Sequence, residues 1–178
     1  MKDASHVFKK IPLLKQWILD LLKENEKRAQ SLENFRFLRL YSYCSPRLLQ
    51  SVRVVVVETL PLPPLASWGV TEFKPFEREP FLAITYADTI FLLKSELMNE
   101  AVVFHELVHV LQWKLLGEDL FLRLYVEGLL EEMYFTCPLE VMAYKAQEEF
   151  EDNSAVYDLE KRVKEEIKAL EKNNRDAT

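Results

Sequence analysis

Hydrophobic and polar positions follow a helical period near the start of the chain. Hydrophobic residues recur at spacings of three and four, at Val7, Ile11, Leu14, Ile18 and Leu21. This spacing places side chains on one face of an α-helix. The run ends in the polar stretch 23–30. We therefore expect an N-terminal surface helix that buries one face.

Two later hydrophobic runs have the pattern of strands. Residues 52–57 are rich in valine, and the proline-rich stretch 61–64 that follows would end a strand. The run 81–93 is interrupted at 87–88, which predicts two short strands that pair as a hairpin. The segment 35–43 is compatible with either a helix or a strand.

The second half of the chain is made of helix-forming sequence with two breaks. Gly117 interrupts it, and Pro138 is suited to the first turn of a new helix. The expected helices span 99–116, 119–135 and 138–171. Together these elements predict a single α+β domain. A small β-sheet with the N-terminal helix, in residues 1–98, would pack on a helical half, in residues 99–178.

Composition and charge narrow the classes of function. The 178 residues are 49% hydrophobic, which suits one folded domain, and the net charge of −6 provides no basic field for nucleic acid. The apolar stretch 11–22 is interrupted by polar residues, so it is neither a membrane span nor a signal peptide. Cys44 and Cys137 are too few for a disulfide scaffold, and we expect reduced thiols. A cytoplasmic protein that binds neither nucleic acid nor a membrane is expected.

One apolar segment, 101–113, carries the candidate chemistry. Its only polar residues are His105, Glu106, His109 and Gln112. A helix this apolar must be nearly enclosed by protein. The two histidines and the glutamine are spaced four and three apart, which places them in one stripe. A buried polar stripe costs stability unless something satisfies it.

A zinc ion would satisfy these side chains. Two imidazoles one turn apart on a helix can both direct a ring nitrogen at one metal ion. Glu106 would then stand beside the ion without binding it, placed to take a proton from a metal-bound water. Two of the only three histidines in the chain fall into this His-Glu-x-x-His pattern. The sequence therefore predicts His105 and His109 as zinc ligands and Glu106 as a general base.

With these residues the chain resembles the gluzincin class of zinc metallopeptidases, and in size and layout its small single-domain members, the minigluzincins. The resemblance covers 81–147, including the hairpin-like run before the motif and the segment Pro-Leu-Glu-Val-Met-Ala-Tyr at 138–144. It implies a peptidase whose zinc is held by the two motif histidines and a glutamate from a later helix. It also implies that a peptide or protein substrate adds as a strand along the hairpin, although the hairpin is equally compatible with an ordinary sheet edge.

Two glutamates compete for the third ligand position. Glu140 lies in a segment that resembles the Glu-x-x-Ala pattern carrying the zinc ligand in several gluzincin families. Glu127 lies in Val-Glu-Gly-Leu-Leu-Glu, which resembles the Asn-Glu-Gly segment of the aminopeptidase branch. A chain reversal at Gly117 would bring Glu127 beside His109. We favour Glu140, because its motif is longer and Pro138 marks the start of its helix.

The predicted activity is hydrolysis of peptide bonds, with Glu106 acting on a metal-activated water. Tyr134 and Tyr144 are candidates for stabilising the oxyanion, and both are also compatible with simple packing. A catalytically silent zinc-binding module and a metal-free helical interaction module are the alternatives. The first 45 residues or the charged C-terminal helix could also cover the cleft and keep an enzyme latent.

Overall fold

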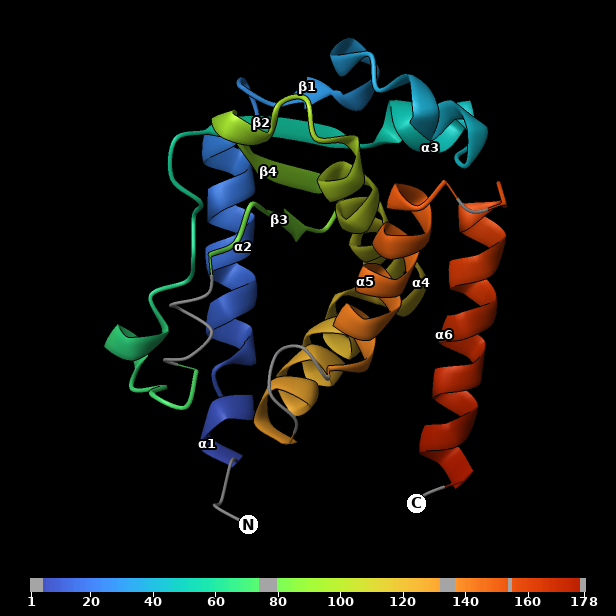
Figure 1. Cartoon of the computed structure of the whole chain (residues 1–178). Helices are drawn as coiled ribbons and strands as arrows, with labels where there is room; N and C mark the ends of the chain where they lie inside the picture. Colours follow the sequence, from blue (N-terminus) through green and yellow to red (C-terminus); the bar gives the residue numbers. More distant parts are fainter. Residues whose placement is uncertain (1–4, 74–79, 132–136, 154, 177–178) are drawn as a thin grey trace.

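The computed structural model describes residues 5–73, 80–131, 137–153 and 155–176. Within them the chain forms a mixed α+β fold, as predicted, with one four-stranded sheet and a larger helical part. In Figure 1 the sheet lies across the top of the molecule, and helices stand below its two ends.

The sheet contains the two strands of the predicted hairpin and the predicted valine-rich strand. Its members are β1 (Gln30–Ser31), β2 (Arg53–Val57), β3 (Ala83–Tyr86) and β4 (Thr89–Leu93). The spatial order is β1-β2-β4-β3, with β2 parallel to β4 and β3 antiparallel to β4. Tyr86 pairs with Thr89, so Ala87 and Asp88 form a two-residue turn, and Ala87 has a positive φ of 56°. The hairpin prediction is confirmed.

The central strands are buried on both faces, which explains their continuous apolar sequences. Val54 and Val55 of β2 and Ile90 and Phe91 of β4 are all at most 1% exposed, although neighbouring residues point to opposite faces. A strand that is covered on both faces has an unbroken run of apolar residues in its sequence. β3 occupies the end of the strand order, beside β4 only.

The N-terminal half contains more short elements than the sequence pattern predicted. Its helices are α1 (Ser5–Phe8), α2 (Ile11–Asn25) and α3 (Pro46–Ser51), and its 3-10 helices include η1 (Leu32–Phe35) and η2 (Leu38–Ser42). The single helix expected from Val7 is divided before α2, which begins with Pro12 in its first turn. The undecided segment 35–43 is largely 3-10 helix.

The helical half is built around α4 (Glu100–Glu131), which contains the first two predicted helices. Asn99 begins it, since its Oδ1 accepts a hydrogen bond from the Val102 amide at 3.3 Å. The predicted break at Gly117 is a bend, where φ is 74° and ψ is 165°. The expected end of the second helix, 132–135, lies outside the described residues.

The prediction of one helix over 138–171 is wrong, because the chain turns between α5 (Pro138–Glu151) and α6 (Leu159–Asp176). Asn153 adopts a positive φ of 52°. Asp158 then caps the new helix by accepting the Lys161 amide at 2.9 Å. The Leu159 amide donates to the Tyr43 carbonyl at 3.0 Å, which ties the start of α6 to the N-terminal half.

Aromatic packing joins these helices to the rest of the core. Phe104 of α4 stacks on Phe150 of α5 with ring centroids 4.4 Å apart, and Tyr43 packs against both rings. Cys44 and Cys137 are both buried and are not joined in a disulfide, and burial raises the pKa of Cys44 to about 12. In the described part of the chain, no helix has both the length and the apolar character needed to cross a bilayer.

Candidate metal centre

The first half of α4 brings both motif histidines to one side of an enclosed helix. The His105 and His109 ring centroids are 4.8 Å apart, as expected for side chains separated by one turn. Around them, Phe104, Leu107 and Val108 are fully buried. Both histidines are buried as well. The apolar surroundings expected from the sequence are therefore present.

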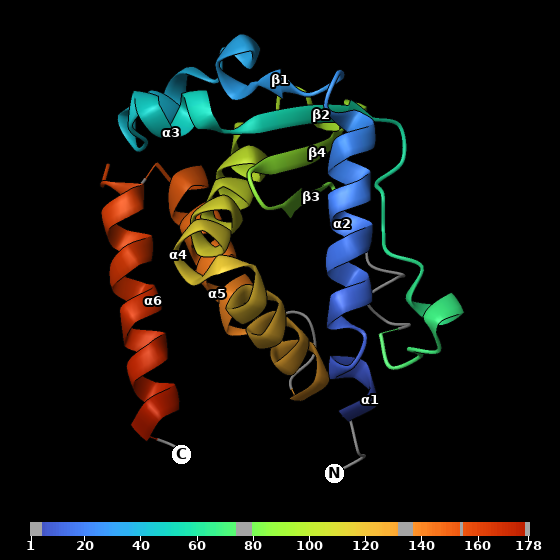
Figure 2. The same cartoon turned by 180° about the vertical axis from the view of Figure 1, so that it is seen from behind.

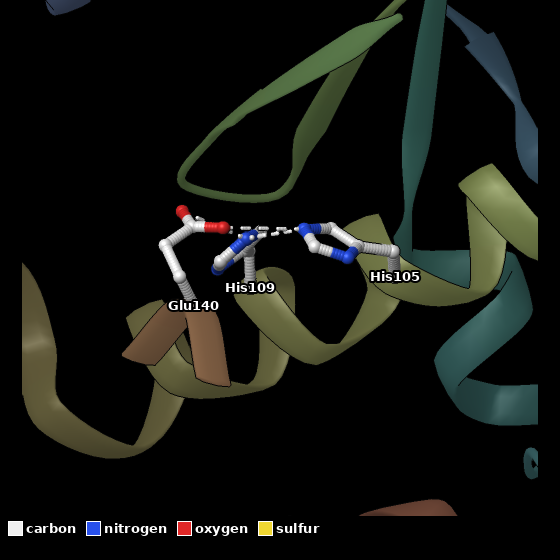
Figure 3. Close-up of side chains that lie close together, drawn as sticks. All are labelled: His105, His109 and Glu140. Carbon is white, nitrogen blue, oxygen red and sulfur yellow. Dashed lines mark hydrogen bonds and ion pairs between the residues drawn. The ribbon is translucent and has the colours of Figure 1, made fainter. Parts of the chain in front are cut away.

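Glu140 joins the histidines from α5. Pro138 occupies the first turn of this helix, so the carboxylate stands at the helix start, where it is 1% exposed. Its Oε1 lies 3.3 Å from Nε2 of His109, and its Oε2 lies 3.4 Å from Nε2 of His105. The two Nε2 atoms are 3.0 Å apart. Figure 3 shows the three side chains meeting between α4 and the green hairpin ribbon.

These three residues form a buried group that could hold a metal ion. Within the described residues, Nδ1 of His105 and Oε2 of Glu140 are buried atoms with no hydrogen-bond partner. Burial raises the pKa of Glu140, but the two histidines outweigh it and hold this pKa well below its ordinary value. Burial lowers the pKa of His109, but the Glu140 carboxylate outweighs it and raises this pKa to about 9. The group therefore favours a bound cation, which is a proton or a metal ion.

Gln112 connects the two helices that supply the ligands. Its Nε2 donates to the Leu139 carbonyl at 2.9 Å, and its Oε1 lies 2.8 Å from Nδ1 of His109. An amide oxygen can only accept, so Nδ1 of His109 carries a proton. In the neutral ring, Nε2 is then the nitrogen with a free lone pair, and this is the atom that faces His105 and Glu140.

Glu106 lies beside the three possible ligands and is held by a strand. The Thr85 hydroxyl of β3 donates to its Oε2 at 2.6 Å, and both residues are buried. Glu106, His109 and Glu140 line one cavity. The structure therefore puts the predicted general base next to the three possible metal ligands.

Glu127, the alternative third ligand, points away from the two histidines. Its Oε1 accepts a hydrogen bond from Nε of Arg123 at 2.8 Å, and its side chain is 34% exposed. Tyr125 is the residue of this part of α4 that reaches Glu140, through a hydroxyl that donates to Oε1 at 2.6 Å. Positions two apart lie about 200° apart around a helix. Because Tyr125 faces the centre, Glu127 faces away from it.

The two tyrosines proposed from the sequence have different outcomes. Tyr144 packs edge-on against His105 with ring centroids 4.6 Å apart, so it lies at the centre. Tyr134 falls outside the described residues. The sequence did not single out Tyr125, because no spacing pattern connects it to Glu140, which lies 15 positions later on another helix.

A cavity of about 100 Å³ opens beside the three possible metal ligands. Apart from the site residues its walls are mostly apolar, and they come from α2, the segment before β3, β3 itself and α4. Leu14 and Ile18 of α2 line it, and no described residue of α6 does. In both views α4 and α5 stand between α2 and α6 (Figures 1 and 2). Of the two segments that could cover the cleft, the N-terminal one therefore lines this cavity, whereas the described residues of the C-terminal helix do not.

The arrangement combines a possible metal site, a neighbouring buried carboxylate and an apolar cavity that contacts both. A metal ion beside a carboxylate is the combination that activates water for hydrolysis.

No family model, curated protein or solved structure matches the chain.

Proposed function

We propose that the protein is a zinc-dependent metallopeptidase of the gluzincin type. The observation that carries the proposal is the triangle of His105, His109 and Glu140 ligand atoms, with Glu106 on the wall of the same cavity. Three protein ligands leave one position of a tetrahedral ion open for water or substrate, as in catalytic zinc sites.

The spacing of the ligand atoms supports zinc. Ligands at 2.0–2.1 Å from a tetrahedral ion lie roughly 3.3 Å from one another. The two Nε2 atoms are 3.0 Å apart, Oε2 of Glu140 lies 3.4 Å from Nε2 of His105, and one ligand atom from each residue lies within 4.8 Å of the others. Two imidazoles and one carboxylate also suit zinc better than magnesium or calcium, which prefer shells of oxygen atoms.

The residues around the site have separable roles in this proposal. Bound zinc would supply a Lewis acid and lower the pKa of water. Glu106 accepts the proton of the attacking water and returns it to the leaving amine. The Thr85 hydroxyl donates a hydrogen bond to Oε2 of this carboxylate, so Oε1 is the oxygen that accepts and returns the proton. Gln112 keeps Nε2 of His109 directed at the ligand cluster.

The surroundings are suited to an extended peptide. β3 ends the strand order of the sheet and supplies Thr85, and a peptide added to such an edge gains backbone hydrogen bonds. The apolar cavity beside the ligands would receive a side chain of the substrate. The resemblance of 105–112 and 138–144 to gluzincin motifs agrees with this substrate class.

The first experiment measures metal content and cleavage in the same preparations. We expect about one zinc per chain in the wild type, and its loss in His109→Ala and Glu140→Ala. Glu127→Ala is the matched control, since its partly exposed carboxylate pairs with Arg123. A peptide library analysed by mass spectrometry then tests for hydrolysis.

Glu106→Gln separates catalysis from binding. Glutamine keeps the shape of the side chain but cannot act as a base, so zinc should remain while cleavage falls by about 100-fold or more. Zinc binding with no cleavage of any peptide by the wild type would favour the catalytically silent zinc module. A wild type that binds no zinc, even after zinc is added back, would overturn the proposal.

A further inference from the structure

Tyr125 contacts a metal-binding residue from a part of α4 that the motif does not include. Its hydroxyl donates to Oε1 of Glu140 at 2.6 Å, a short distance typical of a hydrogen bond to an ionised carboxylate. Its ring lies 6.5 Å from that of His109, which is 16 positions earlier. In a straight helix 16 positions would span about 24 Å. The bend of α4 at Gly117 therefore returns Tyr125 to the centre.

Packing fixes the orientation of the Tyr125 ring. It stacks on Phe121 with ring centroids 5.6 Å apart, and Phe121 stacks in turn on Trp113 at 4.1 Å. Trp113 follows the motif on the first half of α4. This row of three rings crosses the bend and connects both halves of the helix. The position of the Tyr125 hydroxyl is thus fixed by the packing of the three rings.

The two oxygens of Glu140 differ because of this contact. Oε1 already accepts the Tyr125 hydroxyl, whereas Oε2 is buried and has no hydrogen-bond partner among the described residues. A carboxylate with one oxygen engaged presents the other to a metal ion. The hydroxyl also restricts rotation of the carboxylate, which would otherwise have to be ordered when the ion binds.

We propose that Tyr125 is a positioning residue of the metal centre, which holds the Glu140 carboxylate so that Oε2 binds the ion. This rests on the proposed metal centre but not on peptidase activity. The hydroxyl acts through Glu140 and does not itself bind the ion. Loss of an outer hydrogen-bond partner of a metal ligand typically weakens metal binding by about 10–100-fold.

The test compares zinc affinity in wild type, Tyr125→Phe and a matched control. Phenylalanine keeps the ring stack and removes only the hydroxyl. Tyr86→Phe is the control, since Tyr86 lines the same cavity but its hydroxyl donates to the Pro61 carbonyl at 2.9 Å. Competition with a chromophoric chelator should show binding weakened about 10–100-fold in Tyr125→Phe and little changed in Tyr86→Phe.

A second variant tests whether the effect passes through Glu140. A Glu140→Ala protein is expected to lose zinc during purification, but its two histidines can still bind added zinc weakly. In that background, titrated with excess zinc, adding Tyr125→Phe should change the zinc affinity by less than about threefold. The visible spectrum of bound Co²⁺ should also differ between wild type and Tyr125→Phe, because the ligand sphere changes. A general loss of folding would instead appear in the circular dichroism of the metal-free proteins.

The outcomes separate this inference from the proposed function. Equal zinc affinity and equal Co²⁺ spectra in wild type and Tyr125→Phe would overturn the role of Tyr125 and leave the metal centre standing. An equally large effect in the Glu140→Ala background would also overturn it. A wild type that binds no zinc would overturn the metal centre and this role together, whereas a zinc protein that cleaves nothing would overturn only the peptidase.

Discussion

Thr85 and Glu106 are buried partners from different elements, a strand and the motif helix. Their hydrogen bond of 2.6 Å joins side chains that lie 21 positions apart. A buried carboxylate without a donor would be costly, and one without a fixed orientation would be a poor base. The threonine hydroxyl meets both needs, since it satisfies Oε2 and holds the carboxylate against the cavity.

Replacing Thr85 with valine is predicted to reduce peptide cleavage. Valine has nearly the same shape but no hydroxyl, so Oε2 of Glu106 loses its donor. We expect kcat to fall by about tenfold or more, while KM and zinc content change little. Thr85→Ser, which keeps the hydroxyl, should recover most of the activity. Steady-state kinetics with elemental analysis checks this, and an equal loss in the valine and serine variants would contradict it.

The residues of the centre differ in how far the sequence predicts them. His105, Glu106 and His109 share one helix, so their spacing alone predicts a common position. Glu140 is predicted only through its motif, since no spacing rule connects it to α4. Thr85 and Tyr125 carry no signal at all in a single sequence, because their contacts depend on how β3 and the bent end of α4 pack around the site.

Gly117 determines the course of the longest helix. Its φ of 74° and ψ of 165° fall in a region that is essentially restricted to glycine. A Cβ added here would meet no atom within 4 Å, so the requirement comes from the backbone rather than from crowding. Bending α4 at this residue brings Phe121 and Tyr125 back towards the motif half.

Gly117→Ala is therefore predicted to destabilise the protein. An alanine at these angles costs about 1–3 kcal/mol in the free energy of unfolding, because the native backbone becomes strained. Lys114→Ala, at an exposed position of the same helix, should change this free energy by less than about 0.5 kcal/mol. Urea unfolding measures both. Equal stabilities of the two variants would show that the bend does not depend on glycine.

Turns were predicted correctly where the sequence pattern is interrupted. They were missed where a helical spacing of hydrophobic residues continues through the turn. The hairpin was predictable because Ala87 and Asp88 interrupt its run of large apolar and β-branched residues. The turn between α5 and α6 was not, since Leu159, Val163 and Ile167 continue a helical stripe with no proline or glycine nearby. There Asn153 supplies the positive φ, which asparagine tolerates better than most residues.

At the scale of the whole molecule, the candidate metal centre joins parts that the sequence cannot place relative to one another. The parallel pairing of β2 with β4 has no local signature, yet it fixes the sheet from which β3 reaches Glu106. Likewise, the sequence predicts helices that begin near 99 and at 138, and it favours Glu140 as a ligand from its motif. It does not predict the packing of α4 against α5 that sets Glu140 against the two histidines. A metal ion bound there would connect the two helices directly.

Removing the metal is accordingly predicted to lower the stability of the entire fold. An ion that binds the folded chain and not the unfolded one stabilises it by about 2.7 kcal/mol at a free concentration 100 times its Kd. For a chain of this size that corresponds to a rise in Tm of about 5–10 °C. Calorimetry of the chelator-treated protein, with and without added zinc, measures the shift. His109→Ala should abolish it, and a shift of equal size in that variant would mean that zinc acts at another site.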